Sequence, residues 1–222
     1  MSLVKIEELW PLMLCFYPYY DNHGGNGTRV LLEDGQVLTD KRKTKTLLEA
    51  MGRIFAADLA ALRHKYQGVL GHKGLVPLPL HCDLVLVPFR VRRVQYKDHG
   101  ATGYVVLDRV EGLKTVDSGQ AAAGRSPLPD AAVSTRVVFR GGMHLDCMEK
   151  MVTVKKRLAE AGEVKEEYSR FHRGTGILSV RELVREGLPG GGEKIVYHIH
   201  YHTGSLPGTP GSFRSPVLPG KG

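Results

Sequence analysis

The chain has 222 residues, of which 42% are hydrophobic and 24% are charged, and these fractions are typical of a soluble globular protein. They allow one large domain or two small ones and exclude a chain too polar to fold. The net charge of +8 favours an anionic partner, with nucleic acid first and an acidic membrane surface second. A solvated basic surface without such a partner is the alternative.

The N-terminal part contains an apolar run from Leu9 to Tyr20, which is interrupted by Pro11 and Pro18. No basic segment precedes the run beyond Lys5, and the run is too short to cross a bilayer. It therefore predicts neither a signal peptide nor a membrane anchor. We expect a strand or short helix that covers the core, with a partner-docking segment as the alternative.

A β-hairpin is predicted next, with strands over 28–32 and 36–39 and a turn at 33–35. Apolar residues then recur at helical spacing from Leu47 to Leu62, and Asp40 is expected to cap this helix. Cations at a helix N-terminus are repelled by the positive end of the helix dipole. A phosphate bound there would be attracted by both the cations and the dipole. The basic residues at this end are Lys41, Arg42, Lys43 and Lys45.

The middle of the chain is expected to be extended. Two prolines restrict segment 75–80 to an edge strand, whereas the apolar run 84–87 is typical of a buried strand. Arg90 and Arg92 follow and would share one strand face with Val94 and Tyr96. A hairpin turn at 98–100 and a strand over 102–110 complete this region.

The hairpin-helix unit that begins at Thr28 recurs at Thr135. The matches continue without a gap through Gly35 and Gly142, Leu38 and Leu145, Lys43 and Lys150, and Thr46 and Thr153. We therefore predict an α+β fold of two related β-hairpin-plus-helix halves with additional antiparallel strands. Chance recurrence of a common unit is the alternative.

This repeat suggests four segments. Residues 1–111 form the N-terminal half, and 112–134, rich in Gly, Ala, Ser and Pro, form a linker. Residues 135–202 form the C-terminal half, with the second hairpin-helix unit and a histidine-rich strand. Residues 203–222 are rich in Gly and Pro and are expected to be a disordered tail.

Histidines alternate in the strand expected over 195–202, at His198, His200 and His202. Three imidazoles on one strand face could hold Zn, Cu or Mn, and a Zn or Mn site would support a metal-dependent hydrolase or nuclease. A polar strand face or a base-stacking surface is the alternative. The chain shows no P-loop, GxGxxG, GxSxG or HExxH motif, so a protein that is not an enzyme, and needs no cofactor, is favoured.

Cys15, Cys82 and Cys147 are far apart and form no Cys-x-x-Cys pattern. They predict reduced thiols of a cytoplasmic protein, with neither a disulfide framework nor a zinc site. A reactive thiol at Cys147, just before the second helix, is a further hypothesis.

Basic residues form three groups that could follow a phosphate backbone. No helix-turn-helix, zinc-finger or RNP sequence is present, so a β-rich reader or a minor-groove binder fits better than familiar major-groove recognition. The groups are Lys41, Arg42, Lys43 and Lys45; then Arg90, Arg92 and Arg93; then Lys150, Lys155, Lys156 and Arg157.

Roughly residues 28 to 170 resemble the competence transcription factor family, the ComK-like proteins. The resemblance is carried by His72-Lys73, by the strand Asp83 to Pro88, and by the segment Thr135 to Gly142 with the helix after it. It implies a cytoplasmic DNA-binding activator that acts as a homo-oligomer on A·T-rich duplex through the minor groove. At residue level it carries over only Lys73 and the strand Leu84 to Pro88.

Overall fold

The computed structural model describes residues 4–21, 24–94, 96, 99–116, 134–172, 178–187 and 193–201, the last two ranges for their backbone alone. The chain divides into two compact units, Met1–Ser169 and Arg170–Gly222. The expected tail, 203–222, and most of the expected linker, 117–133, lie outside the described residues. Both copies of the predicted repeat fall within the first unit.

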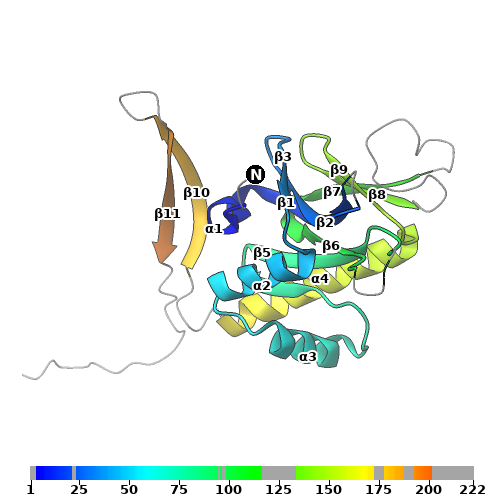
Figure 1. The fold of residues 1–222 in the computed structure, drawn as a ribbon. Coiled ribbons are helices and arrows are strands. Elements are labelled where there is room, and N and C mark those ends of the chain that lie inside the picture. The colour runs from blue at the N-terminus through cyan, green and yellow to red at the C-terminus, as the bar shows by residue number, and fades with distance from the viewer. Residues whose placement is uncertain are drawn as a thin grey trace, which may run out of the picture. The chain divides into compact units, whose positions relative to one another are not determined.

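Runs of antiparallel strands are separated by helices along the chain, which confirms the predicted α+β class (Figure 1). The elements are α1 (Ile6–Leu9), η1 (Trp10–Leu12), β1 (Met13–Tyr20), β2 (Asn26–Leu32), β3 (Val37–Asp40), α2 (Thr44–Ile54), α3 (Leu59–Leu70), β4 (Leu78–His81), β5 (Leu84–Arg90), β6 (Thr102–Val106), η2 (Leu107–Arg109), β7 (Val110–Thr115), β8 (Thr135–Phe139), β9 (His144–Cys147), α4 (Met151–His172), β10 (Leu178–Gly187) and β11 (Glu193–Tyr201).

The first unit contains a six-stranded sheet, ordered β3-β2-β1-β6-β5-β4, and a three-stranded sheet, ordered β7-β8-β9. Two apolar clusters cover the six-stranded sheet. One joins strand residues such as Phe16 and Val30 to Leu47 and Met51 of α2. The other joins residues of β1, β2, β5 and β6 to β8, β9 and α4, so both repeat copies contribute to one core.

The second copy reproduces the strand register of the first. Thr28 pairs with Asp40 and Val30 with Leu38 in β2–β3, while Thr135 pairs with Cys147 and Val137 with Leu145 in β8–β9. The turns also correspond, because Gly35 and Gly142 have φ values of 84° and 81°, in the left-handed region that favours glycine. The two copies therefore share one hairpin geometry as well as a sequence pattern.

A buried hydroxyl ties each hairpin to the start of its helix. Thr28 Oγ1 donates to the carbonyl of Arg42 at 2.7 Å, and Thr135 Oγ1 donates to the carbonyl of Glu149 at 2.7 Å. Both threonines are fully buried. In each copy of the repeat, this bond fixes the position at which the backbone leaves the hairpin and enters α2 or α4.

The correspondence extends upstream of the sequence match. A short 3-10 turn leads into β1 and another leads into β7, and each strand has an irregularity near its start, between Met13 and Cys15 and between Val110 and Gly112. The two strands differ in their surroundings, because β1 lies inside its sheet and β7 is an edge. β7 also occupies 110–115, where a linker was expected to begin.

The helix expected over 47–62 is two helices. Ala56 has a φ of 49°, which ends the first helix, and the Asp58 side chain accepts from the amides of Ala60 and Ala61 to begin the second. The apolar stripe continues across this break, so periodicity did not reveal it.

Asp40 does not cap α2 as expected, because Lys43 occupies the N-cap position and the Asp40 carboxylate binds Arg42.

All three cysteines are free thiols, as predicted. Burial raises the pKa of Cys15 far above its ordinary value and raises the pKa of Cys147 to about 12. Since the thiolate is the reactive form, neither sulfur is suited to nucleophilic chemistry. The hypothesis of a reactive thiol at Cys147 is therefore wrong.

Replacing either tying threonine with valine keeps the shape and removes the donor. We expect Thr28→Val and Thr135→Val each to lower the free energy of unfolding by about 1–2 kcal/mol, because a carbonyl loses its hydrogen bond. Urea denaturation measures this change, with the exposed Thr115→Val as a matched control. A Thr135→Val protein as stable as the wild type would contradict the tie in the second copy.

Candidate nucleic-acid interface

The basic group before α2 separates into a structural arginine and exposed lysines. Arg42 contacts both carboxylate oxygens of Asp40, with Nη2 to Oδ2 at 2.6 Å and Nε to Oδ1 at 3.0 Å, and Nη2 also donates to the carbonyl of Val4 at 2.6 Å. Lys41, Lys43 and Lys45 are exposed. Arg42 therefore serves mainly to hold the N-terminal segment on β3.

The Asp40 carboxylate is fully buried and has a displaced pKa. Burial by itself would raise this pKa, but hydrogen bonds from the Arg42 side chain and amide and from the Val4 amide outweigh it and hold the pKa below its ordinary value. Asp40 therefore stays ionised at neutral pH.

The second basic group also separates. β5 ends at Arg90, so the strand alternation expected to continue through Arg92 stops there. Arg90 and Arg93 are exposed, whereas Arg92 is only 4% exposed. Arg92 donates to the carbonyl of Gly100 at 2.8 Å and to Oδ1 of Asn26 at 2.6 Å, so its guanidinium is occupied inside the protein.

An open groove of about 670 Å³ lies between α2 and α3. It is lined by the basic residues Lys45, Arg53 and Arg63, with Glu49 and Asp58 as the acidic ones. Lys45 pairs loosely with Glu49 at 3.9 Å, and the Asp58 carboxylate caps α3. The remaining lining is apolar or glycine, so positive charge is in excess along the groove.

A second hollow lies beside the first, and Arg63 lines both. Lys73, in the exposed loop between α3 and β4, lies on this second hollow with Tyr104 of β6. Burial raises the pKa of Tyr104, and the positive charge of Arg63 together with its hydrogen bond partly offsets that rise. The two hollows thus bring Lys45 and Lys73, which were both singled out in the sequence, onto one basic track.

Arg53 and Arg63 were not among the site residues predicted from the sequence. Both lie off the apolar stripe, and that position was the signal available in the sequence. The break at 55–58 is what brings the start of α3 to the same groove as α2. Gly52 permits the close approach, since a Cβ there would lie 3.0 Å from Cγ of Leu59 and 3.2 Å from the carbonyl of Ala57. The groove therefore depends on a turn that periodicity did not predict.

The third basic group lies at the start of α4. Arg157 is held by Glu149 at 2.6 Å and by the carbonyl of Pro88 at 2.8 Å, and Lys156 lies 3.7 Å from Glu160. Lys150 and Lys155 are exposed. The amide of Met148 donates to the carbonyl of Arg90 at 2.8 Å, which brings this group beside the end of β5.

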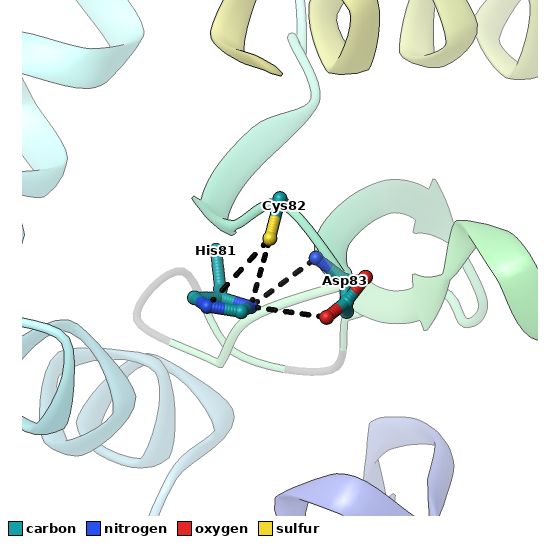
Figure 2. Close-up of side chains that lie close together, drawn as sticks. All are labelled: His81, Cys82 and Asp83. Atoms are coloured by element: carbon teal, nitrogen blue, oxygen red, sulfur yellow. Dashed lines mark hydrogen bonds and ion pairs between the residues drawn. The ribbon is translucent and has the colours of Figure 1, made fainter. Parts of the chain in front are cut away.

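Among the described residues, one group of His, Cys and Asp side chains lies close enough to suggest a metal: His81, Cys82 and Asp83 in the β4–β5 turn (Figure 2). Cys82 Sγ is nearly equidistant from the two ring nitrogens of His81, at 3.5 and 3.7 Å, so it lies over the ring face. A metal must bind in the ring plane, where Nδ1 already accepts from the Asp83 amide at 3.2 Å. This arrangement fits a closed turn better than a metal site.

The histidine-rich segment forms β11 as far as Tyr201, which confirms the predicted strand, and His202 lies outside the described residues. β10 pairs with β11 so that Glu182 is the register partner of His198 and Ser179 that of His200. The predicted metal set of His198, His200 and His202 stays a prediction.

Comparison with family models, curated proteins and solved structures finds no match for this chain. In the part of the chain that the structure describes, every helix is too short or too polar to span a bilayer. The chemistry of the basic track is therefore the basis for a functional proposal.

The Asp40–Arg42 pair predicts a pH-dependent stability. Because the folded pKa of Asp40 is below its unfolded value of about 4, ionised Asp40 adds stability above that pH and loses it as the pH falls through the folded value. We expect Asp40→Asn to cost about 2 kcal/mol at pH 7, and the difference from wild type to shrink below about pH 4.

Thermal unfolding between pH 2 and pH 7 measures this difference. Asp34→Asn, a change in the exposed β2–β3 turn, is the control and should leave the pH profile nearly unchanged. A constant gap between Asp40→Asn and wild type across this range would show that ionisation of Asp40 is not responsible.

Proposed function

We propose that the protein binds duplex DNA through phosphate contacts along the track formed by Lys45, Arg53, Arg63 and Lys73, and acts as a transcriptional regulator. The supporting observation is that Arg63 lines both hollows, so that cations from α2, α3 and the following loop border two adjacent depressions. Long cations along a groove neutralise phosphates and release counterions, which provides affinity without a base-reading motif.

Further exposed cations lie outside this track. Lys41 and Lys43 precede α2, and Arg90, at the end of β5, lies beside the segment that leads into α4. Arg42 and Arg92 support the proposal indirectly, because their guanidinium groups hold the chain that carries these residues. We assign them a positioning role in place of the phosphate contacts first expected of them.

The finer parts of the proposal rest on the resemblance to competence transcription factors. They are activation of transcription in the cytoplasm, preference for the A·T-rich minor groove, and a homo-oligomeric state. Arginine is the side chain that enters a narrow minor groove most readily, and Arg93 is exposed on a projecting hairpin where it could do so.

A metal-dependent hydrolase or nuclease is the second candidate. It is favoured by the backbone pairing of Glu182 with His198 in the β10–β11 register, because carboxylate and imidazole groups are common Zn and Mn ligands. Metal analysis of untagged protein tests it. Retention of Zn or Mn that is lost in a His198→Ala, His200→Ala protein would support this function, and metal-free protein that binds neither ion would remove it.

Neutralising the track should change the salt dependence of DNA binding. We expect Arg53→Gln with Lys73→Gln to weaken binding and to lower the slope of log K against log salt by about 2, because two phosphate contacts are lost. Fluorescence anisotropy with A·T-rich duplex, G·C-rich duplex and single-stranded DNA measures both quantities.

The matched control is Lys114→Gln with Arg140→Gln, which removes the same charges from exposed positions on β7 and the β8–β9 turn. It should reduce the slope much less. Equal slopes for the two double variants would assign binding to net charge alone, and no binding at low salt would end the proposal of a DNA-binding function.

A further inference from the structure

The β5–β6 hairpin extends beyond the six-stranded sheet. Its two arms remain paired past the strands, since the amide of Val91 donates to the carbonyl of Ala101 at 2.9 Å. Farther along, the amide of His99 donates to the carbonyl of Tyr96 at 3.0 Å. Backbone hydrogen bonds therefore continue past the ends of both strands.

Arg92 anchors this projection. Its guanidinium binds the opposite arm at Gly100 and the start of β2 at Asn26, and it stacks on the Tyr20 ring at 4.1 Å. Within the described residues no hydrogen-bond partner meets its Nη1 atom, and no carboxylate contacts the guanidinium. Burial lowers the pKa of Arg92, so desolvating this cation is costly. The contacts of Arg92 with Tyr20 and Asn26 nevertheless attach the hairpin to β1 and β2.

The anchored tip presents apolar side chains to solvent. Tyr96 is 63% exposed and Val94 is 45% exposed, and Arg93 beside them is exposed as well. The Tyr96 ring meets the His99 ring edge to face, with centroids 4.9 Å apart at 66°, and His99 Nδ1 lies 3.0 Å from the Tyr20 hydroxyl. Tyr96 therefore packs on His99, which in turn contacts Tyr20 of β1.

From this arrangement we propose that Tyr96, with Val94, is a base-contacting wedge that the β5–β6 hairpin inserts between unstacked bases of bound duplex DNA. The proposal rests on the DNA-binding function proposed above and adds a contact that phosphate neutralisation does not provide. Exposed aromatic rings on rigid supports are suited to stacking, and apolar wedges of this kind accompany minor-groove binding. Arg90 and Arg93 supply the cations that place the hairpin against the backbone.

The wedge should contribute affinity that is independent of salt. We expect Tyr96→Ala to weaken duplex binding about tenfold at every salt concentration, with an unchanged slope of log K against log salt, because no ionic contact is lost. Tyr96→Phe should bind like wild type. Phe171→Ala, which removes another exposed ring, is the control and should bind like wild type too.

Fluorescence of 2-aminopurine placed in the duplex reports unstacking directly. Wild type and Tyr96→Phe should increase the signal on binding, and Tyr96→Ala should not. Salt-dependent binding by wild type with an unaffected Tyr96→Ala would overturn the wedge and leave the phosphate-binding function standing. No binding by wild type at low salt would overturn both.

Arg92 provides a separate check on the hairpin. If it positions the tip, Arg92→Ala should weaken binding to about the extent of Tyr96→Ala and leave the salt slope unchanged, and the combined variant should be little worse than either alone. A slope lowered by about 1 would show instead that Arg92 contacts a phosphate, and additive losses would separate it from Tyr96.

Discussion

The six-stranded sheet has two apolar faces, and the rest of the fold follows from the need to cover both. Helix α2 packs against one face, and β8, β9 and α4 of the second repeat copy cover the other. Apolar burial of this kind is the main favourable contribution to folding. It explains why two copies of one unit form a shared core and not two separate domains.

That shared core also brings distant basic segments together. The segment before α4 is hydrogen-bonded to the end of β5. Lys150 and Arg90 therefore lie in the same region although they are far apart in sequence. On the other face, the turn between α2 and α3 gathers Arg53 and Arg63 with Lys45 and Lys73. Charge is distributed by packing, and the sequence order of the cations is a poor guide to their grouping.

Arginines in this protein have two kinds of role. Arg42 and Arg92 use their planar guanidinium groups to join chain segments, one through a carboxylate and the other through carbonyl, amide and ring contacts. Arg53 and Arg93 reach solvent. A basic composition therefore overstates the charge available to a ligand. The β5–β6 hairpin shows both roles, because the buried Arg92 attaches it to the sheet and the neighbouring Arg93 is exposed to a ligand.

Local patterns identified much of the fold. Alternation and turn residues predicted the β2–β3 and β8–β9 hairpins, and the unbroken match from Thr28 and Thr135 predicted a shared plan that the strand registers confirm. The upstream parts of the repeat, β1 and β7, were not matched, because their pairing conserves backbone geometry while their side chains differ. The helix break at Ala56 was missed because its apolar positions stay in phase.

By itself the sequence determined the α+β class, the hairpin-helix repeat, the reduced cysteines and the excess of positive charge, since each depends on residue type and short-range spacing. Only the tertiary structure decided which cations are exposed. Arg90 and Arg92 are two residues apart and chemically identical, yet one faces solvent and the other is 4% exposed. The difference arises because β5 ends at Arg90 and because Tyr20, Asn26 and Gly100 converge on Arg92 from other segments, and such long-range convergence leaves no local pattern.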